Sequence, residues 1–231
     1  MIATAIITAP RPRSTLAESL GSYRRAGFDG EVYICAEPGV DPVVADKVHF
    51  VQNEMCLGNL RNWHRALSLL FTVTTDNWLM VCEDDISWAA KAANVLEREL
   101  NTIAAVPSFA RVGAMSLYLP RRHSKHMKGI RAGWNPGGLG PGTWGFQCMI
   151  FSRAQANWLL NTQHFKGYLA DTKWSKNIDR IVGETILIEQ REILYRVPCL
   201  VDHDLGDANS SLGYRDDRPN LKTDHFVGPR A

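Results

Sequence analysis

The sequence lacks several features that mark broad classes of protein. No window reaches a run of about 18 apolar residues, which a transmembrane helix requires. The chain begins directly with a strand-like run at residues 2–8, so we expect no signal peptide. It holds no internal repeat and no low-complexity segment. These absences predict a cytoplasmic globular protein rather than a membrane, secreted or fibrous one.

Cysteine is scarce and scattered. The five cysteines are odd in number, and no two of them have the spacing of a zinc-binding pair. Four lie in or beside apolar runs, which is typical of buried thiols in a reducing compartment. We therefore expect free thiols and no structural zinc site.

An excess of either charge is also absent. Against 26 Lys and Arg stand 24 Asp and Glu, and the formal net charge of +2 neither demands nor excludes a polyanionic partner. The length of 231 residues and the hydrophobic content of 45% fit one domain that can bury a sizeable core.

Strand-like and helix-like segments alternate along the chain. The first strand–helix–strand unit predicts a parallel sheet, and the mixed pattern after it predicts an α/β sandwich with a mixed central sheet and a Rossmann-like first half. We expect strands at residues 2–8, 31–36, 48–51, 78–82, 111–119, 144–151 and 194–201, and helices at residues 14–26, 58–71, 89–105, 152–160 and 171–189.

The chain is organised around residues 78–85, where an apolar run leads into Glu83, Asp84 and Asp85. The run is typical of a buried strand. Because unpaired carboxylates are very costly to bury, we expect the acids at the carboxyl end of this strand, where a parallel sheet opens into a crevice. Adjacent anions there favour a hard divalent cation, Mn²⁺ or Mg²⁺, that carries phosphate oxygens on its far side. The simpler alternative is that Asp85 or Ser87 caps the next helix.

Other strand-end residues should share this crevice. The parallel arrangement brings the loop at residues 8–13, Glu37 after the second strand and Arg61 at a helix start towards the three acids. Such a set describes a pocket for a nucleoside diphosphate.

These motifs resemble those of the GT-A glycosyltransferases, which use nucleotide sugars. The three acids match the Glu-Asp-Asp form of that family's DXD motif. Residues 58–62 resemble the helix start that precedes the motif, and residues 197–203 followed by Ser210 and Ser211 resemble the late strand whose histidine completes the metal site. The matches follow the family's order and span most of the chain, but the acceptor half matches no single family well.

The resemblance implies a GT-A type α/β/α sandwich and a role for each matching residue. Asp85 and His203 would bind the metal, although a position in a solvated tail is the alternative for His203. The donor-binding residues would be Glu83 and Asp84 at the ribose and sugar, Thr8, Pro10, Arg11 and Arg13 at the base and phosphates, Glu37 at the nucleoside, Arg61 at the acids or phosphates, and Ser210 and Ser211 beside the late strand.

Glycosyl transfer with inversion also needs a base that takes the proton of the acceptor hydroxyl. The position of Asp179 resembles the late acidic element that supplies this base in inverting members, and Glu184 and Asp171 are further candidates. The alternative for each is a surface acid paired with Arg180 or Lys176.

We therefore expect a metal-dependent glycosyltransferase with a nucleotide sugar as donor, in first place a UDP-sugar. Residues 1–87 would bind the donor, and residues 88–231 would bind the acceptor, with a flexible loop at residues 120–143 that is either a lid over an anion or a plain solvated loop. The acceptor stays open between a saccharide and a hydroxymethylated DNA base, whose phosphates the cationic run at residues 121–131 would neutralise.

Two other functions compete with this expectation. A nucleotidyltransferase also combines a Rossmann-like half with metal-binding carboxylates, but it normally carries a glycine-rich phosphate loop, and the loop at residues 9–13 has no glycine. A non-catalytic nucleotide- or sugar-binding module is the second alternative.

Overall fold

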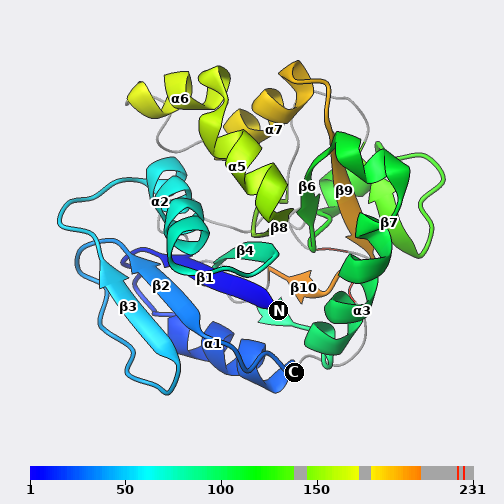
Figure 1. The fold of residues 1–231 in the computed structure, drawn as a ribbon. Helices are drawn as coiled ribbons and strands as arrows, with labels where there is room; N and C mark the ends of the chain where they lie inside the picture. Colours follow the sequence, from blue (N-terminus) through cyan, green and yellow to red (C-terminus); the bar gives the residue numbers. More distant parts are fainter. Residues whose placement is uncertain (138–144, 172–177, 204–222, 224–225, 227–231) are drawn as a thin grey trace.

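The computed structural model describes residues 1–137, 145–171, 178–203, 223 and 226. An eight-stranded sheet lies between two layers of helices (Figure 1). Its strands are β1 (Ile2–Thr8), β2 (Val32–Ala36), β3 (Val48–Gln52), β4 (Trp78–Glu83), β6 (Val112–Ser116), β7 (Gly133–Pro136), β8 (Cys148–Ser152) and β9 (Glu192–Val197). A separate ribbon pairs β5 (Ser87–Trp88) with β10 (Val201–Asp202).

The sheet has the order β3-β2-β1-β4-β8-β6-β9-β7, and it is mixed. The four strands from β3 to β4 are parallel to one another, while β8 runs antiparallel to both β4 and β6. Because β6 and β9 are parallel, the carboxyl ends of β1, β2, β4, β6 and β9 all reach the same edge of the sheet. That edge is where a parallel α/β sheet binds its ligands.

The helices cover the two faces unequally (Figure 1). Alternate strand residues feed two separate cores: Ile6 and Cys82 face one side, and Ala5 and Val81 face the other. The first core includes side chains of α1 (Leu16–Arg25) and α3 (Ala92–Ala104). The second includes side chains of α2 (Asn59–Val73), α5 (Arg153–Asn161), α6 (Gln163–Ala170) and α7 (Ile178–Ile188). The predicted α/β/α sandwich with a mixed central sheet is confirmed.

Several elements differ from the predicted ones. The expected loop at residues 120–143 contains the short helix α4 (Arg121–Ser124) and the edge strand β7, and its residues 138–143 lie outside the described part. The expected strand at residues 194–201 is divided between β9 and β10 at Pro198, because proline has no N–H to continue a ladder. The helix α6 and the 3-10 turn η1 (Pro107–Arg111) were not predicted.

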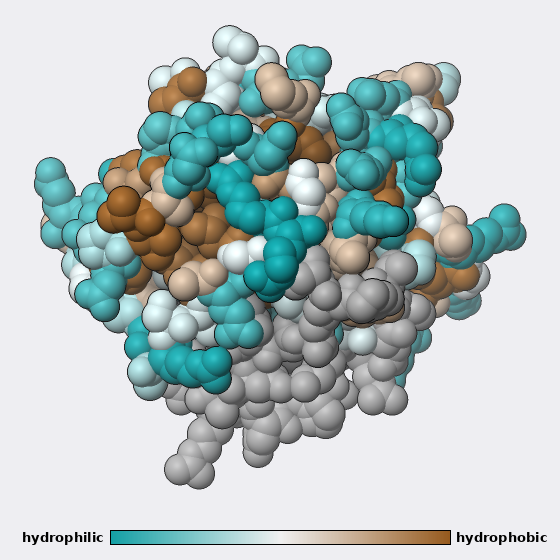
Figure 2. All heavy atoms as spheres, turned by 90° about the horizontal axis from the view of Figure 1, so that it is seen from below, coloured by the Kyte–Doolittle hydropathy of each residue, from teal (hydrophilic) through white to brown (hydrophobic). Residues whose placement is uncertain are grey.

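The surface and the thiols agree with an ordinary globular chain. Figure 2 shows one face, on which hydrophilic side chains predominate and apolar ones gather in smaller patches. No helix among the described residues has the length and apolar character to cross a bilayer. All five cysteines are free, four of them buried and Cys56 exposed.

Candidate active site

The acids lie at the edge of the sheet where β4 ends. Pairing of Ile7 with Glu83 brings the end of β1 beside the residue that follows, and the Thr8 hydroxyl donates to Asp84 Oδ2 over 2.5 Å. Asp84 is only 1% exposed, so its carboxylate faces the protein and not an open crevice. Strand register therefore decides which of the three acids is enclosed.

Arg11 lies against the same acids. Its Nη2 is 2.6 Å from Asp84 Oδ1, and its Nη1 is 2.9 Å from Asp85 Oδ2. Burial opposes the guanidinium charge, but the charges of Asp85, Asp84 and Glu83 outweigh burial and raise the pKa of Arg11. We predicted Arg11 along the base and phosphates; in the structure its guanidinium contacts two carboxylates, and the contact with the donor stays a prediction.

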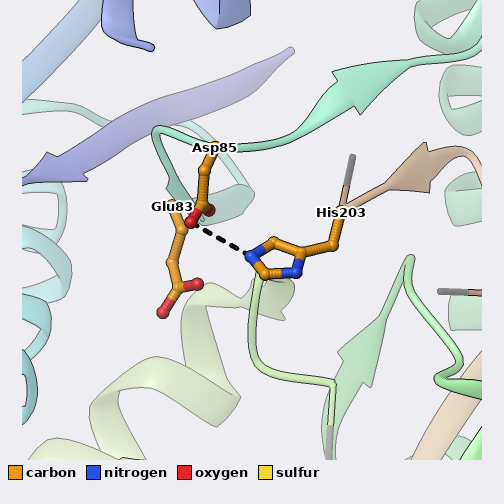
Figure 3. A group of neighbouring side chains, drawn as sticks. All are labelled: Glu83, Asp85 and His203. Atoms are coloured by element: carbon orange, nitrogen blue, oxygen red, sulfur yellow. Dashed lines mark ion pairs between the residues drawn. The ribbon is translucent and has the colours of Figure 1, made fainter. Parts of the chain in front are cut away.

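His203 reaches Asp85 through the small β-ribbon. In that ribbon Asp202 pairs with Ser87, so the next residue comes to the loop that holds Asp85. His203 Nε2 lies 3.0 Å from Asp85 Oδ2, as Figure 3 shows. Burial favours the neutral acid, but His203 and Arg11 outweigh it and hold the pKa of the Asp85 carboxyl well below its usual range.

Three of these side chains have the arrangement of a metal site (Figure 3). Glu83, Asp85 and His203 each offer one ligand atom, and these atoms all lie within 4.8 Å of one another. Asp85 Oδ1 is buried, and it has no hydrogen-bond partner among the described residues. Carboxylate oxygens with one imidazole nitrogen suit Mn²⁺, and the carboxylates suit Mg²⁺. The residues present therefore fit a divalent cation.

Glu83 is the least compensated acid of this group. Burial, and after it the charge of Asp85, raises the pKa of Glu83 to about 7. A cation between the two carboxylates removes that repulsion. We predicted Glu83 and Asp84 as a donor-binding pair, but the structure separates them: Glu83 joins Asp85 and His203, and Asp84 joins Thr8 and Arg11.

Asn59 is a site residue that the sequence did not single out. It is the first residue of α2, and its amide Nδ2 donates to Glu83 Oε1 over 3.3 Å. The residue before it, Gly58, has φ +75°, which favours glycine at this helix start. The only signal in the sequence was the Gly-Asn pair at positions 58 and 59, and this pair is equally typical of a helix start with no role in a site.

Asp179 lies close enough to Glu83 and His203 to interact with both electrostatically. Its Oδ1 accepts a hydrogen bond of 3.1 Å from the Phe146 N–H. The carbonyl of the next residue, Gln147, accepts a hydrogen bond of 2.8 Å from the Glu83 N–H. Burial raises the pKa of the Asp179 carboxyl to about 6. A carboxylate next to the metal-ligating group, with a pKa near neutrality, has the properties of a base.

The other two candidate bases lie elsewhere. Glu184 accepts from Arg180 Nε at 2.7 Å and from the Tyr168 hydroxyl at 2.9 Å. It thus forms the pair with Arg180 that we gave as the alternative to a catalytic role. Asp171 directly follows the end of α6. Through the adjacent residues Phe146 and Gln147, Asp179 is linked to the backbone of Glu83.

Glu37 directly follows the end of β2, and its carboxylate is used inside the protein. The Glu37 N–H donates to the Thr8 carbonyl over 2.9 Å, which keeps the ends of β1 and β2 together. Its two carboxylate oxygens accept from the Leu57 N–H at 3.1 and 2.9 Å, and Asn53 Nδ2 donates to Oε2 at 3.2 Å. Glu37 thus holds the loop that leads into α2.

The remaining predicted residues are spread more widely. We predicted that Arg61 orients the acids or phosphates; in the structure its Nε and Nη2 both donate to the Leu169 carbonyl, at 3.1 and 3.0 Å, and the role towards phosphates stays a prediction. Arg13 is 79% exposed and pairs with Glu18, and Pro10 is exposed. Ser210 and Ser211 lie outside the described residues.

A hollow of about 310 Å³ lies at the opposite edge of the sheet. Its lining includes Phe109, Arg111, Trp134 and Glu192, which come from η1, β7 and the start of β9. It contains none of the predicted site residues.

Comparison with known proteins finds similarity in structure but none in sequence. No protein family and no curated protein matches this sequence. The chain is similar in structure to the mannosyltransferase PcManGT from Pyrobaculum calidifontis, solved in complex with GDP-Man and Mn²⁺, with a TM-score of 0.50 and 12% identity over 84% of this chain. It is also similar to TarS of S. aureus, with a TM-score of 0.52 and 10% identity over 84% of this chain.

The likeness covers only part of those proteins. This chain spans 56% of the mannosyltransferase and 36% of TarS. At identities this low, the likeness shows a shared fold. The chain thus has the α/β fold of a solved nucleotide-sugar-bound mannosyltransferase.

Proposed function

We propose that this chain is a metal-dependent glycosyltransferase of the GT-A type, which moves a sugar from a nucleotide sugar to an acceptor hydroxyl. The observation that carries the proposal is the group formed by Glu83, Asp85 and His203, whose ligand atoms lie within 4.8 Å of one another. The group lies at the carboxyl ends of parallel strands, where sheets of this kind bind nucleotides. The shared fold with a mannosyltransferase that binds GDP-Man and Mn²⁺ supports the same proposal.

The donor side uses the three acids unequally. Asp85 and His203, together with Glu83, hold Mn²⁺ or Mg²⁺, and the bound ion supplies positive charge that stabilises the leaving diphosphate. Asp84 is a positioning residue, because its contacts with Thr8 and Arg11 fix the turn between β4 and the metal ligands. Asn59 orients Glu83 through its amide.

Asp179 is the proposed base of an inverting transfer. The acceptor oxygen forms a bond to the anomeric carbon, the bond from that carbon to the diphosphate breaks, and the hydroxyl proton passes to the Asp179 carboxylate. With a pKa raised to about 6 by burial, this carboxylate is ionised at neutral pH and is a stronger base than an exposed aspartate.

The donor and the division of the chain follow from the same proposal. We place the donor-binding half at residues 1–87 and the acceptor-binding half at residues 88–231, with a UDP-sugar as the first donor to test. GDP-mannose belongs in the same panel, because the similar mannosyltransferase was solved with GDP-Man. The acceptor is a saccharide or a hydroxymethylated DNA base. The five free thiols support a reducing compartment such as the cytoplasm.

One observation favours a second candidate, a nucleotide-binding module without catalysis. Arg11 already neutralises part of the charge of Asp84 and Asp85 without any metal. A module of this kind binds a nucleotide equally well in EDTA and in Mn²⁺, and it turns over no donor. The transferase instead requires the cation for tight donor binding.

The test is a thermal-shift screen of nucleoside diphosphates and sugar nucleotides with and without Mn²⁺. We expect at least one sugar nucleotide to raise the melting temperature only with the metal, because a ligand that binds only the folded state stabilises it by mass action. The change Asp85→Asn should abolish this metal-dependent shift and lower donor hydrolysis by about 100-fold or more.

A matched control is Asp41→Asn, which makes the same change at an exposed acid of the donor half and should leave both readouts unchanged. The variant Glu83→Gln guards against misfolding, because Glu83 has fewer ion-pair partners than Asp85 and the amide oxygen still accepts from Asn59. A folded Glu83→Gln and a folded Asp85→Asn that both keep full Mn²⁺-dependent activity contradict the proposal.

A further inference from the structure

Positive charge is distributed very unevenly along this chain. Between Leu100 and Ala170 there are eight Lys and Arg and no Asp or Glu, although the whole chain has nearly equal numbers of both signs. Five of the eight fall in the short stretch between Pro120 and Ala132. Charge asymmetry of this degree points to a polyanionic partner.

The structure describes three of these five side chains. Lys125, Lys128 and Arg131 are exposed, as is His126 between them, and these four residues form what we call the cationic strip. Among the described residues no acid pairs with any of them. By contrast, the exposed Arg180 pairs with an acid, Glu184. The strip therefore presents positive charge that the protein itself does not neutralise.

The backbone under the strip is fixed. His123 and Ser124 are buried, and Met127 and Ile130 pack against the second core, so the apolar side chains between the cations point inward. The amide of Asn135 ties the end of the strip in place. Its Oδ1 accepts from the Arg131 N–H at 2.9 Å, and its Nδ2 donates to the Arg131 carbonyl at 2.7 Å. A solvated loop needs no such anchoring, whereas a binding surface gains from it because less freedom is lost on binding.

The strip flanks the candidate active site. The chain leaves the sheet after β6 at Tyr118, whose ring lies 6.3 Å from that of His203. It returns at Gly133, which pairs with Val197 at the carboxyl end of β9. Both ends of the segment are therefore at the edge of the sheet that holds the metal-ligating group. Figure 1 shows β7, which follows the strip, at the margin of the sheet opposite β3.

We propose that the cationic strip binds the phosphodiester backbone of a nucleic acid and thereby presents that polymer to the acceptor side of the site. The assignment as acceptor rests on the proposed function, but binding itself does not. A neutral saccharide has no charge for unpaired cations to meet, whereas a nucleic acid carries a regular row of phosphates. A membrane surface fits less well, because the apolar side chains of the segment point into the core instead of outward.

Fluorescence anisotropy of a labelled duplex DNA, measured over a range of salt concentrations, tests the proposal. We expect affinity to fall steeply as salt rises, with each phosphate contact adding about 0.9 to the logarithmic slope. The variant Lys125→Gln/Lys128→Gln/Arg131→Gln should bind at least about tenfold more weakly at low salt and show a correspondingly shallower slope. The three side chains are exposed, so the fold should not change.

The matched control is Lys47→Gln/Lys91→Gln/Arg98→Gln, which removes the same charge from exposed positions outside the strip and should retain most of the affinity. No DNA binding at low salt, or equal loss in both triple variants, overturns the proposal. Strip-dependent binding to vesicles of anionic phospholipid but not to DNA also overturns it. Donor hydrolysis with Mn²⁺ is measured in parallel, since it should survive the strip variant. The DNA-binding measurement thus tests the role of the strip, and donor hydrolysis separately tests the proposed transferase activity.

Discussion

Arg11 brings a positive charge to the acids at the end of β4. Its side chain is only 8% exposed, and its two Nη atoms contact two different carboxylates. Paired geometry of this kind satisfies buried charges that would otherwise be very costly. Arg11 thus allows three consecutive acids to remain in the folded protein before any ligand arrives, and it leaves Asp85 Oδ1 available.

This role predicts a large loss of stability in Arg11→Gln. Glutamine has no charge to balance Asp84 and Asp85, so the free energy of unfolding should fall by about 3 kcal/mol. Mn²⁺ should restore part of the loss, because it supplies a cation to Asp85. Urea unfolding with and without Mn²⁺ measures both effects.

The neighbouring Arg13 provides the control for that measurement. It is 79% exposed and pairs with Glu18 at 3.4 Å, so Arg13→Gln should change the stability by less than about 0.5 kcal/mol. Similar losses in the two variants would show that Arg11 stabilises the fold no more than a surface arginine does.

At the scale of elements, two connections bring the site together. The β5–β10 ribbon carries His203 to Asp85, although these residues are far apart in the chain. The turn before β8 carries Phe146 to Asp179 on α7. Gly145 in that turn has φ +112°, and a Cβ on it would lie 2.7 Å from the Tyr118 carbonyl oxygen. Only glycine fits there without a shift of the backbone.

Gly145→Ala should therefore disturb the turn and with it the contact to Asp179. We expect a loss of about 1 to 3 kcal/mol in the free energy of unfolding, which corresponds to backbone strain at a single position. The matched change Gly30→Ala meets no atom within 4 Å and has no positive φ, so it should be nearly neutral. Thermal unfolding of both variants decides, and equal stability of the two would remove the argument for a strained turn.

At the scale of the whole molecule, one sheet joins the two proposed halves. The strand β4 of the donor half pairs with β8 of the acceptor half along its length, from Trp78 with Ser152 to Cys82 with Cys148. The cores on both faces of the sheet also draw residues from each half. The halves differ in proposed role, but they share the interior that stabilises them.

We therefore predict a single cooperative unfolding transition for the full chain. Tryptophan fluorescence and far-ultraviolet circular dichroism should give the same midpoint in urea, because neither half has a core of its own. A fragment of residues 1–87 should not unfold cooperatively, since its β4 edge has lost its partner. Two separate transitions in the full chain would instead identify two independent domains.

The sequence by itself determined the order of most of the main elements and the place of the acids along the chain. Apolar runs and helical spacing located β1, β2, β3, β4 and α2 closely, because buried strands and amphipathic helices leave periodic patterns. The run of acids after β4 was predicted at a strand end, because carboxylates without partners do not stay in an apolar interior. A helix was predicted at residues 152–160, and in the structure Ser152 caps α5 and forms a capping box with Gln155.

Only the tertiary structure decided which side chains meet. Strand register brings the Thr8 hydroxyl within hydrogen-bond distance of Asp84, and the β5–β10 ribbon brings His203 beside Asp85. The start of α2 brings the Asn59 amide to Glu83. It also turned Arg61 to the Leu169 carbonyl and engaged Glu37 with the loop at residues 53–57. Periodicity records which face of an element is buried, but it does not record which distant residue lies opposite. Those pairings, which no local pattern encodes, give the candidate site its chemistry.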